Sequence, residues 1–132
     1  LHAYGSDIDR FGLIHADMRL GNLLVDGERV TLLDFDDCGF GWHVMDVATS
    51  LLFLLGEPQY EDTCAGFVDG YRTARALPEE HLQILPVFLL ARAMTYVGWC
   101  GSRPEAPIAR EKGPIVVAAT LALAHGFLGQ AA

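Results

Sequence analysis

The apolar positions of the chain follow first the period of strands and then the period of helices. The short run Gly12–Ile14 precedes a polar loop, and residues 22–35, NLLVDGERVTLLDF, hold two apolar runs on either side of Asp26-Gly27. An Asp-Gly pair between two such runs is a strong hairpin signal. The pattern therefore predicts two short strands joined by a tight turn.

From residue 44 the apolar spacing becomes helical. Over residues 44–55 one helical face carries the apolar side chains Val44, Val47, Ala48, Leu51, Leu52 and Leu55. Glycines at 39 and 41 indicate a loop before this helix, and Gly56 ends it. Further helices are predicted to begin at Pro58, at Pro78 with a break near Pro86, and at Pro114, after a loop over residues 101–107. The predicted fold class is α+β, with a small hairpin followed by about four helices.

Size and charge narrow the class of protein. The chain has 132 residues, 52% of them hydrophobic, and a mean hydropathy of +0.27, which indicates a folded domain rather than a disordered segment. Nine Lys and Arg against seventeen Asp and Glu give a net charge of −8 and a pI of about 4.9. This balance argues against a nucleic-acid partner and favours, weakly, a cationic ligand.

The cysteines and the C-terminal segment indicate the cellular compartment in which we expect the protein. Cys38, Cys64 and Cys100 are odd in number and lack CxxC spacing, so we interpret them as reduced thiols of a cytoplasmic protein. The N-terminal residues do not have the pattern of a signal peptide. The uncharged run from Ile115 is nearly long enough to span a membrane, but its Ala, Gly, Thr, His and Gln content favours a buried helix. No membrane partner is expected.

The octapeptide HADMRLGN, residues 15–22, carries the candidate chemistry. A general base needs a carboxylate on a stiff loop, and a divalent metal on nucleotide phosphates needs oxygen ligands. His15, Asp17 and Asn22 follow the order H-x-D-x-x-x-x-N of kinase catalytic loops. The hairpin then returns the chain to LLDFDD, which should bring Asp34 close to Asn22, so that both can bind one Mg²⁺.

Residues 13–41, LIHADMRLGNLLVDGERVTLLDFDDCGFG, resemble the catalytic core of the aminoglycoside phosphotransferase and choline kinase group, relatives of protein kinases. That family commonly has H-G-D-x-x-x-x-N, a hairpin and then I-D-[FW]-[DE]. The resemblance implies a kinase-like fold and transfer of the γ-phosphate of ATP, with Mg²⁺, to a small-molecule hydroxyl. Acceptors of this kind are aminoglycosides, choline, homoserine and similar amino alcohols.

The resemblance also implies roles for individual residues. Asp17 matches the catalytic aspartate, and His15, in the same catalytic motif, matches the histidine that buttresses the loop. Asn22 and Asp34 match the metal and cofactor ligands, Arg19 and Asp36 are candidate substrate contacts, and Asp46 matches an aspartate that supports the loop backbone from the next helix. The sequence departs from the family in having Ala16 where Gly is common and Arg19 where His is frequent.

The chain matches only the later part of the family fold. About fourteen residues precede the catalytic loop, and neither a glycine-rich phosphate loop nor a strand lysine is among them; Lys112 is the only lysine. We therefore expect a single partial domain over residues 1–132, a C-lobe without its N-lobe. Residues 11–37 form its catalytic loop and metal-binding hairpin, and residues 44–129 its helical subdomain. Such a chain should self-associate near residues 11–35 and turn over poorly by itself.

Two other functions remain open from the sequence. A metal-dependent phosphohydrolase could use the same carboxylates with water as acceptor, and a non-catalytic remnant could serve assembly. The order of the loop residues favours the transferase. For Asp36 and Asp37, metal binding, acceptor binding and capping of a turn remain open. His43, His81 and His125 show no ligand spacing and are expected to be structural.

Overall fold

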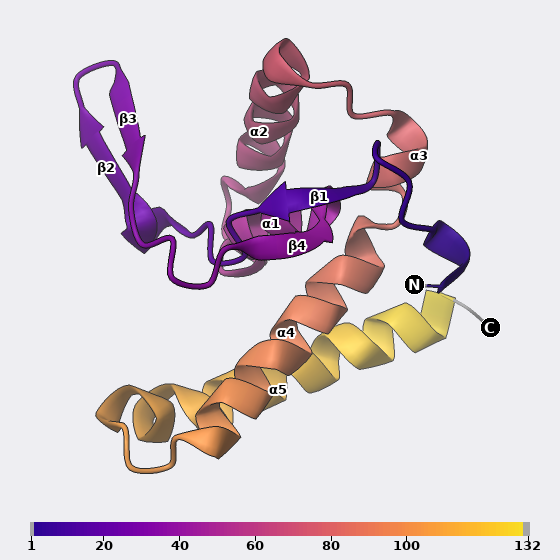
Figure 1. Cartoon of the computed structure of the whole chain (residues 1–132). Helices are drawn as coiled ribbons and strands as arrows, with labels where there is room; N and C mark the ends of the chain where they lie inside the picture. The colour runs from indigo at the N-terminus through magenta and orange to yellow at the C-terminus, as the bar shows by residue number, and fades with distance from the viewer. Residues whose placement is uncertain (1, 131–132) are drawn as a thin grey trace. The chain divides into compact units, whose positions relative to one another are not determined.

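The structure is a computed structural model that describes residues 2–130. Leu1 and residues 131–132, part of the predicted domain 1–132, lie outside the described residues. The chain divides into two compact units, Leu1–Leu85 and Pro86–Ala132. In chain order the elements are η1 (His2–Tyr4), β1 (Phe11–Ile14), η2 (Leu20–Asn22), β2 (Leu23–Asp26), β3 (Arg29–Leu32), β4 (Gly39–Trp42), α1 (His43–Leu52), α2 (Tyr60–Ala74), α3 (Glu79–Leu82), α4 (Leu85–Ser102) and α5 (Pro107–Gln130) (Figure 1).

The predicted hairpin is confirmed as the antiparallel pair β2 and β3. Leu23 pairs with Leu32 and Asp26 with Arg29, so Gly27 and Glu28 form a two-residue loop. Gly27 has φ +58°, a left-handed conformation that glycine adopts without steric cost. The hairpin extends directly from η2, which keeps the end of β3 beside the loop that precedes β2 (Figure 1).

The predicted loop at Gly39 and Gly41 is wrong, because these residues belong to strand β4. β4 runs antiparallel to β1, with Phe11 opposite Trp42 and Ile14 opposite Gly39. A Cβ atom on Gly41 would lie 2.4 Å from Cδ1 of Ile14, so a larger residue there would require the Ile14 side chain to move. Gly41 therefore permits close packing within a sheet, a use of glycine that the sequence pattern does not separate from a loop.

Helix α1 forms the centre of the first unit. Val44, Val47, Ala48 and Leu51 are each at most 1% exposed, as their helical spacing predicted. α1 packs against β1, β4 and α2. Full burial of each of these valine and leucine side chains contributes about 1.5–3 kcal/mol. α1 ends at Leu52, one turn before the predicted end, and the chain then makes tight turns up to Gly56, whose φ is +84°.

The remaining helix starts are partly as predicted. α2 begins at Tyr60, shortly after Pro58, and the break near Pro86 separates α3 from α4. The prediction that Pro114 opens the last helix is wrong, since α5 begins at Pro107 and Pro114 lies inside it. Proline suits a first helical turn, which is the position of Pro107, whereas the internal Pro114 has no N–H for one backbone hydrogen bond of the helix. Gly113 of α5 packs on α4: a Cβ atom added to Gly113 would lie 3.7 Å from Cβ of Cys100.

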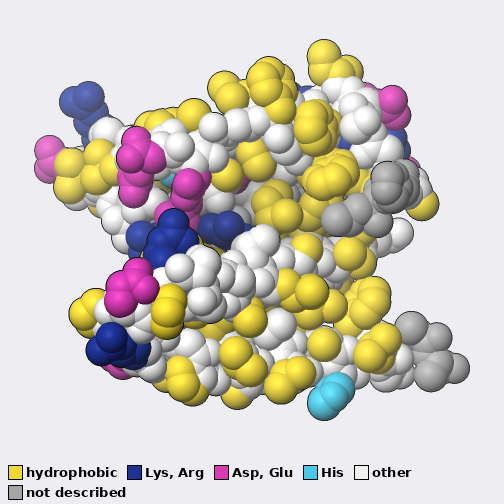
Figure 2. All heavy atoms as spheres, turned by 60° about the horizontal axis from the view of Figure 1, so that its bottom comes forward, with side chains coloured by type: hydrophobic (Ala, Val, Ile, Leu, Met, Phe, Trp, Pro, Cys, Tyr) yellow, Lys and Arg dark blue, Asp and Glu magenta, His cyan; other side chains and the backbone are white. Residues whose placement is uncertain are grey.

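The second unit does not bury the C-terminal helix as predicted. In an 18-residue apolar window within Pro107–Gly129 only 6% of the residues are buried, and in such a window within Glu79–Ser102, the segment that holds α3 and α4, 22% are. Both helices are long and apolar enough to cross a membrane by length and composition alone, which is weak evidence for a span. Hydrophobic side chains cover much of the visible face in Figure 2. On α5, Ile115, Leu121 and Leu128 are 61%, 54% and 63% exposed.

Candidate active site

The polar loop begins where β1 ends, and α1 holds it there through Asp46. The backbone N–H of His15 donates to Oδ2 of Asp46 at 2.8 Å, and the N–H of Ala16 donates to Oδ1 at 2.8 Å. Asp46 is 8% exposed. Two charge-assisted hydrogen bonds on one buried carboxylate fix both the position and the direction of the chain before Asp17. This is the contact that the family resemblance implies for Asp46.

Ala16 adopts a conformation that normally favours glycine. Its φ is +67°, in the left-handed region, which costs a residue with a Cβ atom about 1–2 kcal/mol. The bond from its N–H to Asp46 stabilises this conformation. Ala16 therefore adopts a backbone conformation suited to the glycine that is common in the family, at the cost of local strain.

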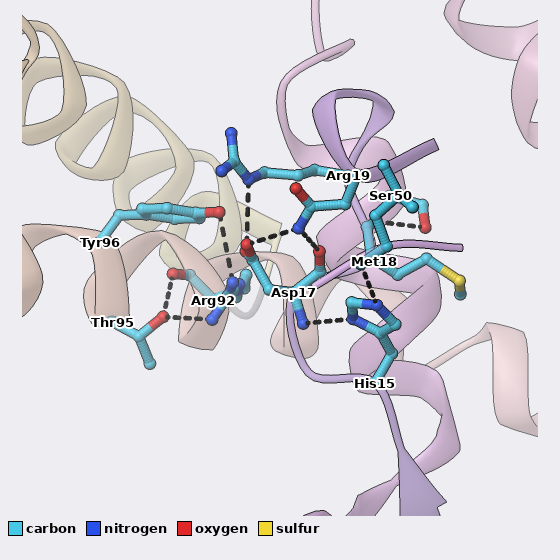
Figure 3. A network of polar contacts seen from close by, with 10 residues as sticks. His15, Asp17, Met18, Arg19, Ser50, Arg92, Thr95 and Tyr96 are labelled. Atoms are coloured by element: carbon cyan, nitrogen blue, oxygen red, sulfur yellow. Dashed lines mark hydrogen bonds and ion pairs between the residues drawn. The ribbon is translucent and has the colours of Figure 1, made fainter. Parts of the chain in front are cut away.

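Asp17, Arg19 and Asn22 form one connected polar group (Figure 3). The Nδ2 amide of Asn22 donates to the backbone oxygen of Asp17 and to its Oδ2, both at 2.9 Å. Nε of Arg19 donates to the same Oδ2 at 3.0 Å. The side chain of Asp17 is 15% exposed, whereas that of Arg19 is 47% exposed. Asp17 is thus held in one orientation and remains partly exposed to solvent.

His15 is buried and uses both ring nitrogens within the loop. Nδ1 accepts the backbone N–H of Asp17 at 3.3 Å, which makes Nε2 the protonated nitrogen that donates to the oxygen of Leu33 at 3.0 Å. The ring also contacts Phe35, with 4.7 Å between ring centroids. This arrangement suits a buttress between the loop and the end of β3, and it leaves neither nitrogen for proton transfer to a substrate.

Asp34 lies directly beyond the hairpin, beside the loop. The N–H of Leu33 donates to the backbone oxygen of Asn22 at 2.9 Å, which places the next residue, Asp34, at the level of Asn22. Asp34 is exposed and has φ +63°, a second left-handed non-glycine residue in this region. Asp36 and Asp37 are also exposed and follow in a turn closed by the bond from Cys38 N–H to Phe35 O at 3.1 Å.

The donor set fits a hard cation that also binds phosphate. Because Nδ2 of Asn22 is committed to Asp17, its Oδ1 is the atom left to act as a ligand, and Asp34 supplies an exposed carboxylate. Within residues 2–130 no group of three or more His, Cys, Asp or Glu side chains could hold a metal. One amide oxygen and one carboxylate are the few protein ligands typical of Mg²⁺ that is bound mainly through nucleotide phosphates and water.

Ser50 is a site residue that the sequence analysis missed. Its hydroxyl lies 2.8 Å from the backbone oxygen of Met18 (Figure 3). It also lies 2.9 Å from the backbone oxygen of Asp46. Ser50 follows Asp46 by four residues, so both face the loop from the same side of α1. This i, i+4 relation was visible in the sequence, but a serine inside a helix more often bonds its own helix backbone.

His43 lies below the sheet at the start of α1. Its ring packs under Gly12, where an added Cβ atom would lie 2.7 Å from Cε1, and its Nε2 is buried without a hydrogen-bond partner among the described residues. Burial, and then the nearby Arg75 guanidinium, lower the pKa of His43. Its neutral form therefore belongs to the folded state, in keeping with the structural role expected from its spacing.

Known proteins share both the sequence and the fold of this chain. Residues 5–81 match the phosphotransferase enzyme family, APH. Amicoumacin kinase of Bacillus subtilis (strain 168) is 36% identical over an alignment of 99 residues, and the match covers 68% of this chain and 30% of that protein. The structure of the microcompartment-associated aminopropanol kinase is 40% identical, with a TM-score of 0.85 over 98% of this chain and 41% of that chain.

A second solved structure agrees in fold. Amicoumacin kinase hAmiN, in complex with AMP-PNP, Ca²⁺ and Ami, has a TM-score of 0.76 over 92% of this chain and 40% of its own, at 24% identity. The chain thus spans less than half the length of these relatives. The predicted α+β, kinase-like fold and the predicted resemblance are both confirmed. On the match over residues 5–81, the chain belongs to the phosphotransferase enzyme family.

Proposed function

We propose that the protein containing this chain is a kinase that transfers the γ-phosphoryl group of ATP to a hydroxyl of a small molecule. The observation that supports this most strongly is the fixed geometry of Asp17, which Asn22 and Arg19 orient through Oδ2 at 2.9 and 3.0 Å. A carboxylate held this way on a stiff, solvent-accessible loop suits a general base for an alcohol acceptor.

In the proposed reaction, Asp17 accepts the proton of the acceptor hydroxyl as its oxygen attacks the γ-phosphorus. The bond between the γ-phosphorus and the β–γ bridging oxygen breaks, and ADP leaves with the electron pair of that bond. Asp17 later returns its proton to solvent. The protein contributes mainly position and charge, which is how phosphoryl-transfer sites accelerate the reaction.

Asn22 Oδ1 and the Asp34 carboxylate would hold Mg²⁺, the metal we propose, against the β- and γ-phosphates. When bound, the ion neutralises the negative charge that the transferred group and ADP carry. A relative that was solved with AMP-PNP and Ca²⁺ supports a nucleotide together with a divalent cation. The backbone bond between Leu33 and Asn22 keeps the two ligand-bearing segments together before the ion binds.

Arg19 and Asp36 are the proposed contacts to the reacting molecules. The Arg19 guanidinium is anchored by its Nε on Asp17 and is 47% exposed, so its outer nitrogens lie where a phosphate oxygen could approach. Asp36 is exposed beyond the hairpin and could accept an ammonium group of an acceptor. Both roles are proposed from the positions of the two residues in the sequence motif and from the exposure of their side chains.

We propose amino alcohols as the acceptor class. The microcompartment-associated aminopropanol kinase, at 40% identity, is named for such a molecule, and the net charge of −8 favours a cationic ligand.

Cys38, Cys64 and Cys100 are free thiols, which supports the proposal of a cytoplasmic protein.

The experiment is an ADP-release assay on the complete natural protein with ATP, Mg²⁺ and single acceptors. Aminopropanol, choline, homoserine and an aminoglycoside form the panel, and ethylamine, which lacks the hydroxyl, is the matched control. Release of ADP that requires one hydroxylated amine supports the kinase. Equal release without any acceptor would instead identify a phosphohydrolase. Failure to bind nucleotide with Mg²⁺ would identify a non-catalytic remnant and end the proposal.

A further inference from the structure

We propose that Ser50 is a positioning residue, which sets the orientation of the Asp17–Arg19 segment by holding the carbonyl of Met18. The inference rests on the proposed function only for its kinetic consequence. Its structural part concerns how α1 fixes the loop on both sides of Asp17, at Asp46 and at Ser50.

The segment that Ser50 contacts is a tight turn. The N–H of Arg19 donates to the backbone oxygen of Asp17 at 2.9 Å, an i+2 to i bond that closes a three-residue turn centred on Met18. Such a turn directs the carbonyl of its central residue away from the ring of the turn. The Met18 carbonyl therefore depends on a partner from another element, and the hydroxyl of Ser50, at 2.8 Å, is that partner.

The other acceptor near Ser50 does not compete equally. The backbone oxygen of Asp46, at 2.9 Å, lies in the first turn of α1 and accepts a bond of the helix itself, whereas the carbonyl of Met18 lies in the loop. The hydroxyl has one hydrogen to donate. Its hydrogen bond stabilises the structure most when the acceptor is partly buried and has no partner within a helix. Ser50 thus joins α1 to the loop rather than only to its own helix.

The rotation of the Met18 peptide matters for the proposed base. That peptide carries the N–H of Arg19, and Arg19 in turn donates through Nε to Oδ2 of Asp17. A turn that is free to rotate would let Arg19 move off Asp17 and would widen the range of carboxylate orientations. Misplacement of a catalytic group by a fraction of an ångström lowers the rate of the chemical step more than it lowers the affinity for substrate.

The test compares Ser50→Ala, Ser50→Thr and Thr49→Val in the complete natural protein. Thr49 is the matched control, because its hydroxyl also bonds a carbonyl of α1, that of Met45 at 2.8 Å, and does not contact the loop. We expect Ser50→Ala to lower kcat by about 5- to 30-fold with the KM for ATP within about twofold, which corresponds to about 1–2 kcal/mol at 1.36 kcal/mol per tenfold. Ser50→Thr should restore most of kcat, and Thr49→Val should leave it unchanged.

Two further measurements separate positioning from simple stability. In an Asp17→Asn background, Ser50→Ala should cause little additional loss, because both substitutions act on the same group. Amide hydrogen exchange over residues 17–19 should accelerate in Ser50→Ala and not in Thr49→Val. An equal loss of kcat in the Thr49 variant, full kcat in Ser50→Ala, or an independent effect in the Asp17→Asn background would each overturn the proposal.

The exchange measurement also distinguishes failure of this inference from failure of the proposed function. If the protein has no kinase activity but Ser50→Ala alone accelerates exchange at residues 17–19, the positioning role stands and the kinase is wrong. If activity is present and exchange over residues 17–19 is the same in wild type and Ser50→Ala, the kinase stands and the role of Ser50 is wrong.

Discussion

Asp46 holds Ala16 in a left-handed backbone conformation: Oδ1 of Asp46 accepts the Ala16 N–H at 2.8 Å, and φ of Ala16 is +67°. The same carboxylate binds His15 through its other oxygen. The chain therefore enters the candidate active site along a path that a residue with a Cβ atom would not take alone. The hydrogen bonds to the buried Asp46 carboxylate of α1 therefore offset the backbone strain at Ala16.

Ala16→Gly is expected to stabilise the protein. Glycine removes the left-handed strain of about 1–2 kcal/mol. It also raises the conformational entropy of the unfolded chain, which favours unfolding by about 0.4–1 kcal/mol. The free energy of unfolding should therefore rise by about 0.5–1 kcal/mol. Urea denaturation measures this change. Ala65→Gly, at an exposed position inside α2, is the matched control and should lower the free energy by about 0.5–1 kcal/mol. Destabilisation of similar size at both positions would contradict the strain at Ala16.

Asp46→Asn should be strongly destabilising at nearly constant volume. The amide has one acceptor oxygen for two N–H donors, one buried and one partly buried, so His15 or Ala16 loses its partner and faces an NH₂ group. An unsatisfied buried donor costs about 1–3 kcal/mol, and we expect a loss of this size or slightly more in the free energy of unfolding. Thermal and urea unfolding measure it. Asp69→Asn, at an exposed position on α2, should change the free energy by less than about 0.5 kcal/mol.

Asp17→Asn should lower turnover and leave nucleotide binding in place. The substitution preserves the hydrogen bond from Arg19 to the side-chain oxygen but removes the group that accepts the proton. In the complete natural protein we expect kcat to fall by about 10²- to 10⁴-fold, with the Kd for ATP within about threefold. Steady-state kinetics and nucleotide titration test the two halves. Wild-type turnover in this variant would exclude Asp17 as the base.

Stability should fall on acidification through His43. Burial and Arg75 lower its pKa in the folded state, whereas the unfolded chain titrates near 6.5. As the pH falls below about 6.5, the unfolded state binds the proton first, so the free energy of unfolding decreases until the folded pKa is passed. His43→Phe keeps a ring under Gly12 and removes this titration. A series of urea midpoints from pH 7.5 to 5.5 should be flatter in the variant, and identical slopes would refute this assignment.

The 132-residue chain alone should self-associate through the hairpin. Val25 and Val30 pair across β2 and β3 and are 63% and 59% exposed, and within residues 2–130 neither strand has a strand partner on its outer edge. Light scattering after size exclusion should give a mass above 14.4 kDa that falls toward the monomer in Val30→Lys. The matched control is Thr31→Lys, at the next position along the strand, which adds the same charge on the other face of the hairpin. A monomeric wild-type chain would contradict this prediction.

Much of the site was predictable from the sequence because its residues are close together along the chain. His15, Asp17 and Asn22 lie within one octapeptide, and the Asp26-Gly27 hairpin brings Asp34 back to them by local turn geometry alone. The helical face of α1 was equally readable, because burial of Val44, Val47, Ala48 and Leu51 follows directly from a period of 3.6.

The tertiary structure decided what depends on distant segments. Gly41 is a strand residue because it pairs with Gly12 of another strand, and Ser50 is a site residue because the Met18 carbonyl faces it across 32 positions of sequence. The exposure of α5 likewise could not be read from its composition. Spacing along a chain encodes local geometry, whereas the partner of a glycine, a hydroxyl or an apolar helix is set by how separate elements pack.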